Sequence, residues 1–190
     1  GPAFRLFDDH GNVLVLRPDL TIPVARLAAT RLAAHPGPVR VSYVATAVRP
    51  APVGKARNIE QRQAGAELIG ASGPAADAEI IALLVDALRG LGVSDLQLGL
   101  NDTAITRAVL DGLGIAADDQ ARLSDAARRR NRVAWRRIAS SLPLSDDART
   151  TLADLPALRG GDDQLHDLAR RVPAAADACS SLIATRELLR

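Results

Sequence analysis

The stretch VLRPDLTIPVARLAATRL, residues 15–32, passes from a strand to a helix through a short polar turn. The apolar run predicts a strand that ends at Leu16, and the spacing of apolar residues over 22–34 predicts an amphipathic helix. Asp19 or Thr21 is the predicted N-cap, since either side chain can accept a hydrogen bond from a free N–H of the first helical turn. The turn therefore places a carboxylate and a hydroxyl at the end of a strand, where a ligand can reach them.

Two hairpins flank this turn in the sequence. Residues 4–16 alternate around a turn at 9–12, which predicts the first hairpin. The alternation over 39–49 predicts a half-buried strand, and residues 62–70 predict a second strand that pairs with it antiparallel across a long tip. We expect the strands to lie side by side in an antiparallel sheet.

The rest of the chain is predicted to be mainly helical. The expected segments are a helix over 75–90 with Ile80, Leu84, Ala87, Leu88 and Leu91 on one face, a buried strand over 96–100, a helix capped by Asp102 that runs to Leu113, and helices from Ala116 onward with breaks at Pro143, Pro156 and Pro173. We therefore predict an α+β fold, an antiparallel sheet flanked by helices with a helical C-terminal segment. The predicted domains are the mixed core, residues 1–115, and the helical segment, residues 116–190.

The composition excludes several classes of protein. The 24 basic and 22 acidic residues leave a net charge of +2, and 2% aromatic residues are too few for a base-stacking surface, so nucleic acid is not an expected partner. Cys179 is the single cysteine, which excludes an intramolecular disulfide and argues against a thiolate zinc site. No apolar run approaches the roughly 20 residues of a membrane-spanning helix, and we expect a cytoplasmic protein without metal or cofactor. The chain begins on strand-like sequence and has no methionine, so we expect a piece of a longer protein.

Gln63, Gly65 and Glu67 share one face of the second strand of the long hairpin, because alternate residues of a strand point the same way. The glycine leaves room between an amide and a carboxylate. With Asp19 and Thr21 nearby, these groups could grip a ligand that carries an ammonium and a hydrogen-bonding ring. Glu67 has a second interpretation, as the ion-pair partner of an arginine across the sheet.

Other polar residues have simpler interpretations. Arg49 ends a strand and could present its guanidinium to a phosphate or a carboxylate, although such arginines are commonly just solvated. Arg128, Arg132 and Arg136 repeat every four residues, either as a solvated helix face or as a stripe for nucleic acid or an acidic partner. Trp135 is expected to anchor that helix. The histidines show no ligand spacing and are expected at the surface: His10, His35 and His166.

Three segments together resemble the class II aminoacyl-tRNA synthetase core of the histidyl-tRNA synthetase family, and most closely its non-catalytic branch, the regulatory subunits of ATP phosphoribosyltransferase. They are LRPDLTIPVARLAATRL (16–32), YVATAVRPAP (43–52) and RQAGAELIG (62–70). The resemblance covers residues 4–113 well and the helical tail more loosely. It implies that histidine is bound by Asp19, Thr21, Gln63 and Glu67, and that the former phosphate-facing residues are Arg49 and Arg57.

Two departures from the synthetase pattern concern adenine. The position two residues after Arg49, a glutamate in the synthetase, is Ala51 here, and alanine accepts no hydrogen bond. The aromatic residue that stacks on adenine in the synthetase is replaced by Gln61. Because adenylation needs ATP held in line with the amino-acid carboxylate, these departures predict that catalysis is lost and that the phosphate-facing arginines are vestigial.

The resemblance implies a non-catalytic regulatory subunit of ATP phosphoribosyltransferase that acts in histidine biosynthesis. Its implied partner is a short-form catalytic subunit, and the implied assembly is a homodimer within a hetero-oligomer. Histidine, the implied ligand, would signal through a coupling free energy between its site and the active site of the partner. Two alternatives are open. One is a divergent histidyl-tRNA synthetase core that forms histidyl-adenylate, and the other is an interaction module that keeps the fold but binds no amino acid.

Overall fold

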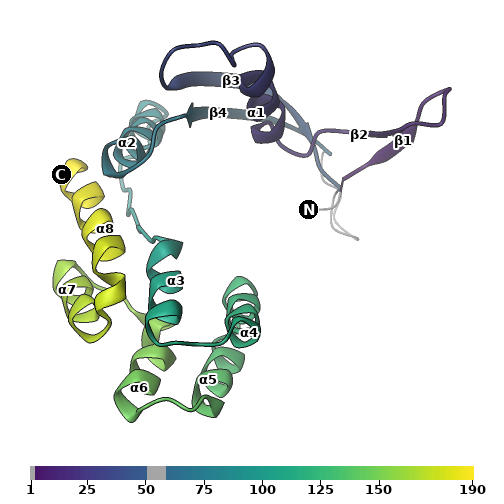
Figure 1. Cartoon of the computed structure of the whole chain (residues 1–190). Helices are drawn as coiled ribbons and strands as arrows, with labels where there is room; N and C mark the ends of the chain where they lie inside the picture. Colours follow the sequence, from purple (N-terminus) through teal and green to yellow (C-terminus); the bar gives the residue numbers. More distant parts are fainter. Residues whose placement is uncertain (1–2, 51–58) are drawn as a thin grey trace. The chain divides into compact units, whose positions relative to one another are not determined.

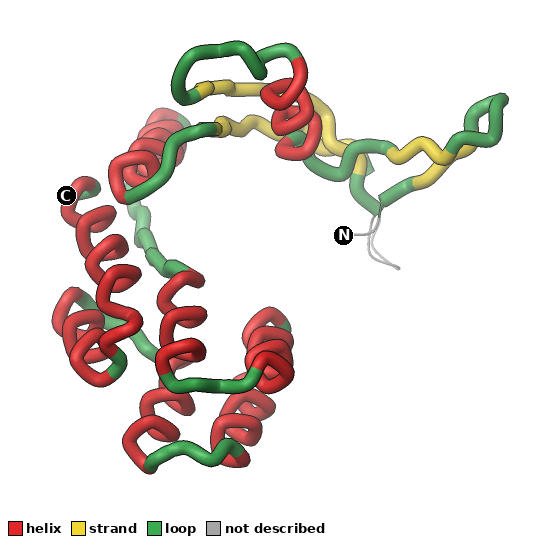
Figure 2. The backbone as a smooth tube through the Cα atoms, in the orientation of Figure 1, coloured by secondary structure: helices red, strands yellow, loops and turns green. Residues whose placement is uncertain are grey.

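In the described residues the strands precede every α-helix except α1 along the chain (Figure 1). The computed structural model describes residues 3–50 and 59–190. The chain divides into two compact units, Gly1–Ser72 and Gly73–Arg190. Figure 2 shows that the strands of the described residues belong to the first unit, whereas the second unit is built from helices.

The first unit consists of two antiparallel hairpins and one helix. Its elements are β1 Arg5–Phe7, β2 Val13–Val15, α1 Thr21–Thr30, β3 Val39–Val48 and β4 Glu60–Ile69. Among the described residues each hairpin is a separate two-stranded sheet, which differs from the predicted continuous sheet. The turn that follows the first hairpin contacts the second hairpin through the N–H of Val48, which donates to the carbonyl of Arg17 at 2.9 Å.

The hairpin of β1 and β2 has the predicted turn, and Asp8 organises it. One carboxylate oxygen of Asp8 accepts from the backbone N–H groups of His10 and Asn12 at 2.9 and 2.8 Å. A further bond from the Asn12 side chain is the main reason that the pKa of Asp8 lies below its usual value. Both faces of the hairpin are apolar and exposed, as shown by Phe7 at 75% and Leu14 at 46%.

Helix α1 packs on β4 through one stripe of small and branched side chains. Leu20, Val24 and Ala28 recur every four residues and are buried. The N-cap is Leu20, so neither predicted cap residue holds that position. The helix also ends at Thr30, earlier than the predicted residue 34, because the N–H of Leu32 donates five residues back, to the carbonyl of Leu27, and leaves the helical pattern.

The second unit contains a bundle of seven α-helices within residues 73–190. These are α2 Pro74–Gly90, α3 Thr103–Gly112, α4 Ala117–Arg128, α5 Arg132–Ser141, α6 Asp146–Asp154, α7 Asp162–Arg171 and α8 Ala176–Leu188, with short 3₁₀ turns η1 Leu155–Ala157 and η2 Pro173–Ala175. Side-chain caps begin several of them, and the predicted cap Asp102 is confirmed, since it accepts from the N–H of Ala104 at 2.7 Å.

Two hydrophobic clusters hold this unit together, and α3 contributes to both. Leu110 points into a cluster built around Trp135, whereas Val109 points into a cluster that includes Cys179. The Trp135 indole is 2% exposed and its Nε1–H donates to the carbonyl of Leu152 at 2.7 Å, which confirms the predicted anchor. Burial raises the pKa of the Cys179 thiol, as expected for a packed, unreactive cysteine.

The predicted strand over 96–100 is wrong. This segment is irregular, and Leu98 is 48% exposed. A short apolar run is compatible with a strand, but a strand also needs a hydrogen-bonding neighbour, and the described residues supply none beside it. The predicted apolar face of α2 is also only partly covered, because the helix packs on α8 while Leu84 and Leu91 stay exposed.

The arginine stripe predicted as one helix face is interrupted. Helix α4 ends at Arg128, Arg130 adopts a positive φ of 54°, and Asn131 then caps α5. Arg128 therefore lies on a different helix from Arg132 and Arg136. The solvated interpretation holds for Arg128, which pairs with Asp125 on its own helix.

The structure agrees with the predicted surface positions of the histidines, since each of His10, His35 and His166 is exposed. No helix in the described residues is both long enough and apolar enough to cross a bilayer. The predicted domain boundary between residues 115 and 116 concerns the organisation of the whole protein and stays a prediction.

Candidate functional site

The polar turn after β2 is tied to the end of β3 by a set of hydrogen bonds. The carbonyl of Arg17 accepts from the N–H of Val48, while its Nε donates back to the carbonyl of Thr46 at 2.8 Å. The Nε of Arg49 donates to the carbonyl of Pro18 at 2.6 Å. These bonds fix the turn that begins α1 against the hairpin of β3 and β4.

Four side chains form a continuous polar network across this junction. Thr21 donates its hydroxyl to Glu67 Oε1 at 2.9 Å. The Tyr43 hydroxyl lies 3.5 Å from the same oxygen and 3.4 Å from Gln63 Nε2. Arg49 extends the network, because its Nη2 donates to Gln63 Oε1 at 3.5 Å. The network thus runs from the turn through both strands and back to the turn.

The donors and acceptors of this network allow one consistent set of directions. Arg49 can only donate, so the oxygen of the Gln63 amide faces it and the NH₂ group faces Tyr43. The Tyr43 hydroxyl accepts from Gln63 and donates to Glu67 Oε1, which also accepts from Thr21. Glu67 Oε2 receives no hydrogen bond from residues 3–50 and 59–190.

The carboxylates at this junction form no ion pair with the guanidiniums beside them within the described chain. Neither Asp19 nor Glu67 forms an ion pair with a described residue, so the ion-pair interpretation of Glu67 finds no partner there. The described contact of Asp19 is a long one, 3.5 Å from the N–H of Ile22. The guanidiniums of Arg17 and Arg49 lie at the same junction but donate to backbone carbonyls, so the two half-buried carboxylates can accept hydrogen bonds from a ligand that carries positive charge and N–H donors.

Gly65 is required by the packing of Tyr43. The antiparallel register sets Tyr43 directly opposite Gly65, on the face that also carries Gln63 and Glu67. A Cβ on Gly65 would overlap the Tyr43 hydroxyl end and lie 3.0 Å from ring carbon Cε2. The tyrosine ring therefore lies over the glycine, between the amide and the carboxylate.

The structure brings together most of the predicted site residues. Thr21, Gln63, Glu67 and Arg49 share one network, and Asp19 lies in the same turn. Arg57 and Ala51 lie outside the described residues. The sequence reasoning missed Tyr43; the alternation of β3 places it on one face of the strand, but only the register with β4 sets it opposite Gly65.

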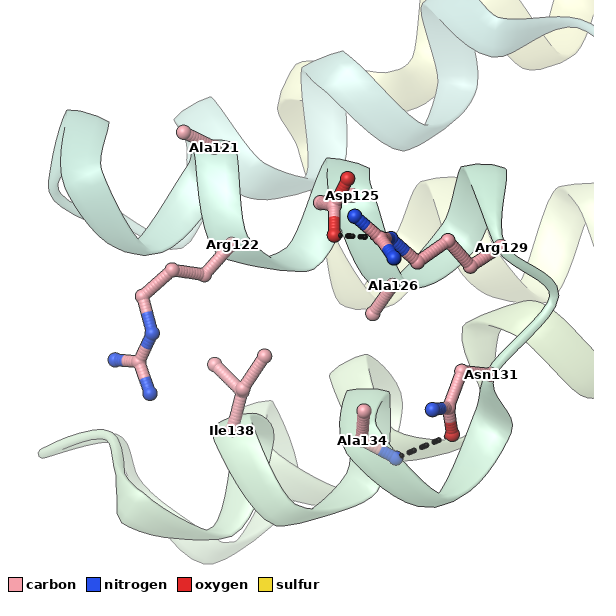
Figure 3. Close-up of a pocket in the computed structure, with 8 residues that line it drawn as sticks. All are labelled: Ala121, Arg122, Asp125, Ala126, Arg129, Asn131, Ala134 and Ile138. Carbon is pink, nitrogen blue, oxygen red and sulfur yellow. Dashed lines mark hydrogen bonds and ion pairs between the residues drawn. The ribbon is translucent and has the colours of Figure 1, made fainter.

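A hollow lies between α4 and α5 in the second unit (Figure 3). Its volume is about 550 Å³, and Figure 3 shows the side chain of Arg129 directed toward Asp125. Arg122 pairs with Asp119 and Arg129 pairs with Asp125, each at 2.7 Å. Hydrogen bonding to Arg128 also keeps the pKa of Asp125 below its usual value. Since these charges already satisfy one another, the hollow offers little to a charged ligand, and the junction of the first unit is the better candidate.

Metal binding has no support in the described residues. No group of three or more histidine, cysteine, aspartate or glutamate side chains converges in residues 3–50 and 59–190. The free groups at the candidate site are carboxylate, amide and hydroxyl, which suit an organic cation better than a bound metal that needs more ligands.

The comparisons with solved structures define the class of the fold. An ATP phosphoribosyltransferase regulatory subunit/histidyl-tRNA synthetase from Bacillus halodurans C superposes with a TM-score of 0.85 at 31% identity, over 98% of this chain and 49% of that one. A histidine–tRNA ligase subunit from Alicyclobacillus acidocaldarius gives 0.71 at 27% identity, over 98% and 58%. The predicted class II aminoacyl-tRNA synthetase-like fold is confirmed.

The family follows from the sequence. The model of the family described as histidyl-tRNA synthetase matches residues 2–190, and the chain therefore belongs to the histidyl-tRNA synthetase family.

Curated relatives carry a more specific name. The ATP phosphoribosyltransferase regulatory subunit of Desulfitobacterium hafniense is 36% identical over 181 residues, 94% of this chain and 46% of the relative. The protein of the same name from Bacillus subtilis is 39% identical over 162 residues, 83% of this chain and 40% of the relative. The predicted resemblance is confirmed, and the chain spans less than half the length of these two relatives.

Proposed function

We propose that the protein is the regulatory subunit of ATP phosphoribosyltransferase and that it binds histidine without activating it. The observation that carries the proposal is the similarity to proteins of that name over most of the chain. It is supported by a site whose amino-acid side retains the expected residues, among them Thr21, Gln63 and Glu67. The adenine side has lost the residues expected there.

The amino-acid side suits histidine by its chemistry. Histidine carries an ammonium, a carboxylate and a ring with an N–H donor. Asp19 and Glu67 supply acceptors for the cationic and N–H groups, and Gln63 retains one amide N–H after its bond to Tyr43. The half-buried positions of these side chains make such bonds stronger than they would be in bulk water.

The adenine side does not suit ATP. Gln61 is exposed on β4 and faces Ala47 across the hairpin, so neither side chain offers a ring to stack on a base. Arg49 uses its Nε and Nη2 within the protein, on Pro18 and Gln63, where it supports the histidine side. This internal role explains how a former phosphate ligand can be retained without catalysis.

Regulation then requires a partner and a difference in binding. The partner we propose is the short-form catalytic subunit, joined by a homodimer of the regulatory protein within a cytoplasmic hetero-oligomer. Residues 1–115 are proposed to form the synthetase-like core and residues 116–190 a helical segment. Histidine must bind one arrangement of the assembly more tightly than another, since equal affinity would shift nothing.

The full-length protein is expected to activate a short-form ATP phosphoribosyltransferase that is weak or silent alone. The measurement is the rate of phosphoribosyl-ATP formation with and without the added subunit, followed by titration with histidine. Activation that histidine reverses supports the proposal. A rate that the added subunit does not change would contradict the proposal and favour the alternative of an interaction module that binds no histidine.

The full-length protein is also expected to show no histidine-dependent exchange of pyrophosphate into ATP, because Ala51 and Gln61 offer no adenine contacts. A heat-inactivated sample provides the background. Exchange above that background would favour the alternative, a divergent histidyl-tRNA synthetase that forms histidyl-adenylate.

A further inference from the structure

We propose that Tyr43 is a positioning residue of the histidine site, which holds Glu67 and Gln63 in the orientation that recognises the imidazole N–H. The ring of Tyr43 packs on Gly65. The inference rests on the proposed histidine site and adds a residue and a source of specificity to it. Tyr43 is the chain's single tyrosine, and its hydroxyl is the link between the two ligand-facing side chains of β4.

The position of the hydroxyl explains why a tyrosine is needed. Gln63 and Glu67 lie four residues apart on β4 and have no direct contact with each other. The Tyr43 hydroxyl lies 3.4 Å from one and 3.5 Å from the other, so it bridges them across the gap above Gly65. Phenylalanine would fill the same space and leave both side chains unlinked.

The direction of the bonds ties this bridge to ligand recognition. Glu67 Oε1 is occupied by the hydroxyls of Thr21 and Tyr43, which leaves Oε2 as the carboxylate oxygen that can accept from a ligand. A ring N–H satisfies such an acceptor, whereas the sulfur of a thiophene ring has no hydrogen to donate. Loss of the Tyr43 hydroxyl would free Glu67 to swing about its bond to Thr21.

The packing of the Tyr43 ring accounts for the glycine at position 65 of β4. Any side chain at Gly65 would meet the hydroxyl end of the tyrosine ring, so the ring would have to leave its place. Gly65→Ala therefore displaces an intact hydroxyl, while Tyr43→Phe removes the hydroxyl from an intact position. The two substitutions test the same bridge by independent routes.

The test is calorimetric titration of the full-length protein with histidine and with β-(2-thienyl)-L-alanine, which keeps the shape of the side chain but lacks the ring N–H. Tyr43→Phe is expected to weaken histidine binding about fivefold, equivalent to about 1 kcal/mol, and to leave thienylalanine binding unchanged. Gly65→Ala should weaken histidine binding at least as much. Ser42→Ala is the matched control for loss of a hydroxyl, because Ser42 points to the opposite face of β3. Gly99→Ala controls for the added methyl, because nothing lies within 4 Å of its Cβ.

The outcomes separate this inference from the function on which it rests. Selective loss of histidine affinity in Tyr43→Phe supports the positioning role. Equal losses for both ligands, or no loss for either, overturn it, since a merely structural tyrosine would affect the two alike. Wild-type protein that fails to bind histidine overturns the proposed site first, and the inference falls with it.

Discussion

Glu67→Gln is expected to weaken histidine binding by the full-length protein more than tenfold, while the melting temperature without ligand barely moves. The change keeps the shape of the side chain and removes its charge. Removing a charged partner from a partly dehydrated site costs about 2 to 5 kcal/mol, largely because buried polar groups are left unpaired. A tenfold loss corresponds to about 1.4 kcal/mol, so the expectation is a lower bound.

Calorimetric titration beside a thermal melt measures both quantities. Glu187→Gln serves as the control. Glu187 is exposed on α8, so this substitution removes the same charge at a position far from the site in the sequence. A Glu67 variant that is destabilised yet binds histidine normally would identify Glu67 as a structural residue and remove it from the site.

Trp135→Ala is expected to lower the free energy of unfolding of the helical unit by about 3 to 5 kcal/mol, the range for large aromatic truncations in cores. The indole fills the cluster that joins α4, α5 and α6, and it is 2% exposed. The substitution also leaves the carbonyl of Leu152 without its indole donor.

Denaturant unfolding of the full-length protein, followed by a probe of helix content, measures this effect. Val133→Ala on the same helix is the control, since Val133 is 80% exposed and its truncation should change stability by less than about 0.5 kcal/mol. Similar losses for both variants would show that the cluster around Trp135 contributes no special stability.

Much of the fold could be predicted because its local patterns are strong. The alternation of β3 and β4 and the cap at Asp102 each depend on residues close in sequence, and the structure has them in place. The strand over 96–100 failed for the opposite reason. A strand depends on a neighbour that may come from anywhere in the chain, and an apolar run carries no information about that neighbour.

The candidate site shows the same division. Gln63 and Glu67 were predictable as a pair, because residues of one strand that are four apart must share a face. Their junction with Thr21 depends on how the turn docks on the hairpin, which the resemblance supplied and residue spacing did not. Tyr43 was missed because its role depends on the register between two strands, and no single segment contains that register.

The internal use of Arg49 could not have been read from the sequence either. As a strand-terminal arginine it suggested a phosphate ligand or a solvated charge. The structure instead gives it hydrogen bonds to Pro18 and to Gln63. Which of its donors are spent within the protein depends on the path of the turn, and that path becomes visible only in three dimensions.

The seating of Tyr43 on Gly65 also makes the long hairpin resistant to slippage. A shift of β4 by one residue would turn Gln63 and Glu67 to the opposite face of the hairpin. A shift by two would keep the face but drive the tyrosine ring against one of those two side chains, because they flank the glycine on its own face. The observed alignment places the ring over the one position on that face without a side chain between Gln63 and Glu67, so Gly65 fixes the register of the two strands. The residues of the proposed histidine site therefore also help to decide whether the hairpin forms correctly during folding.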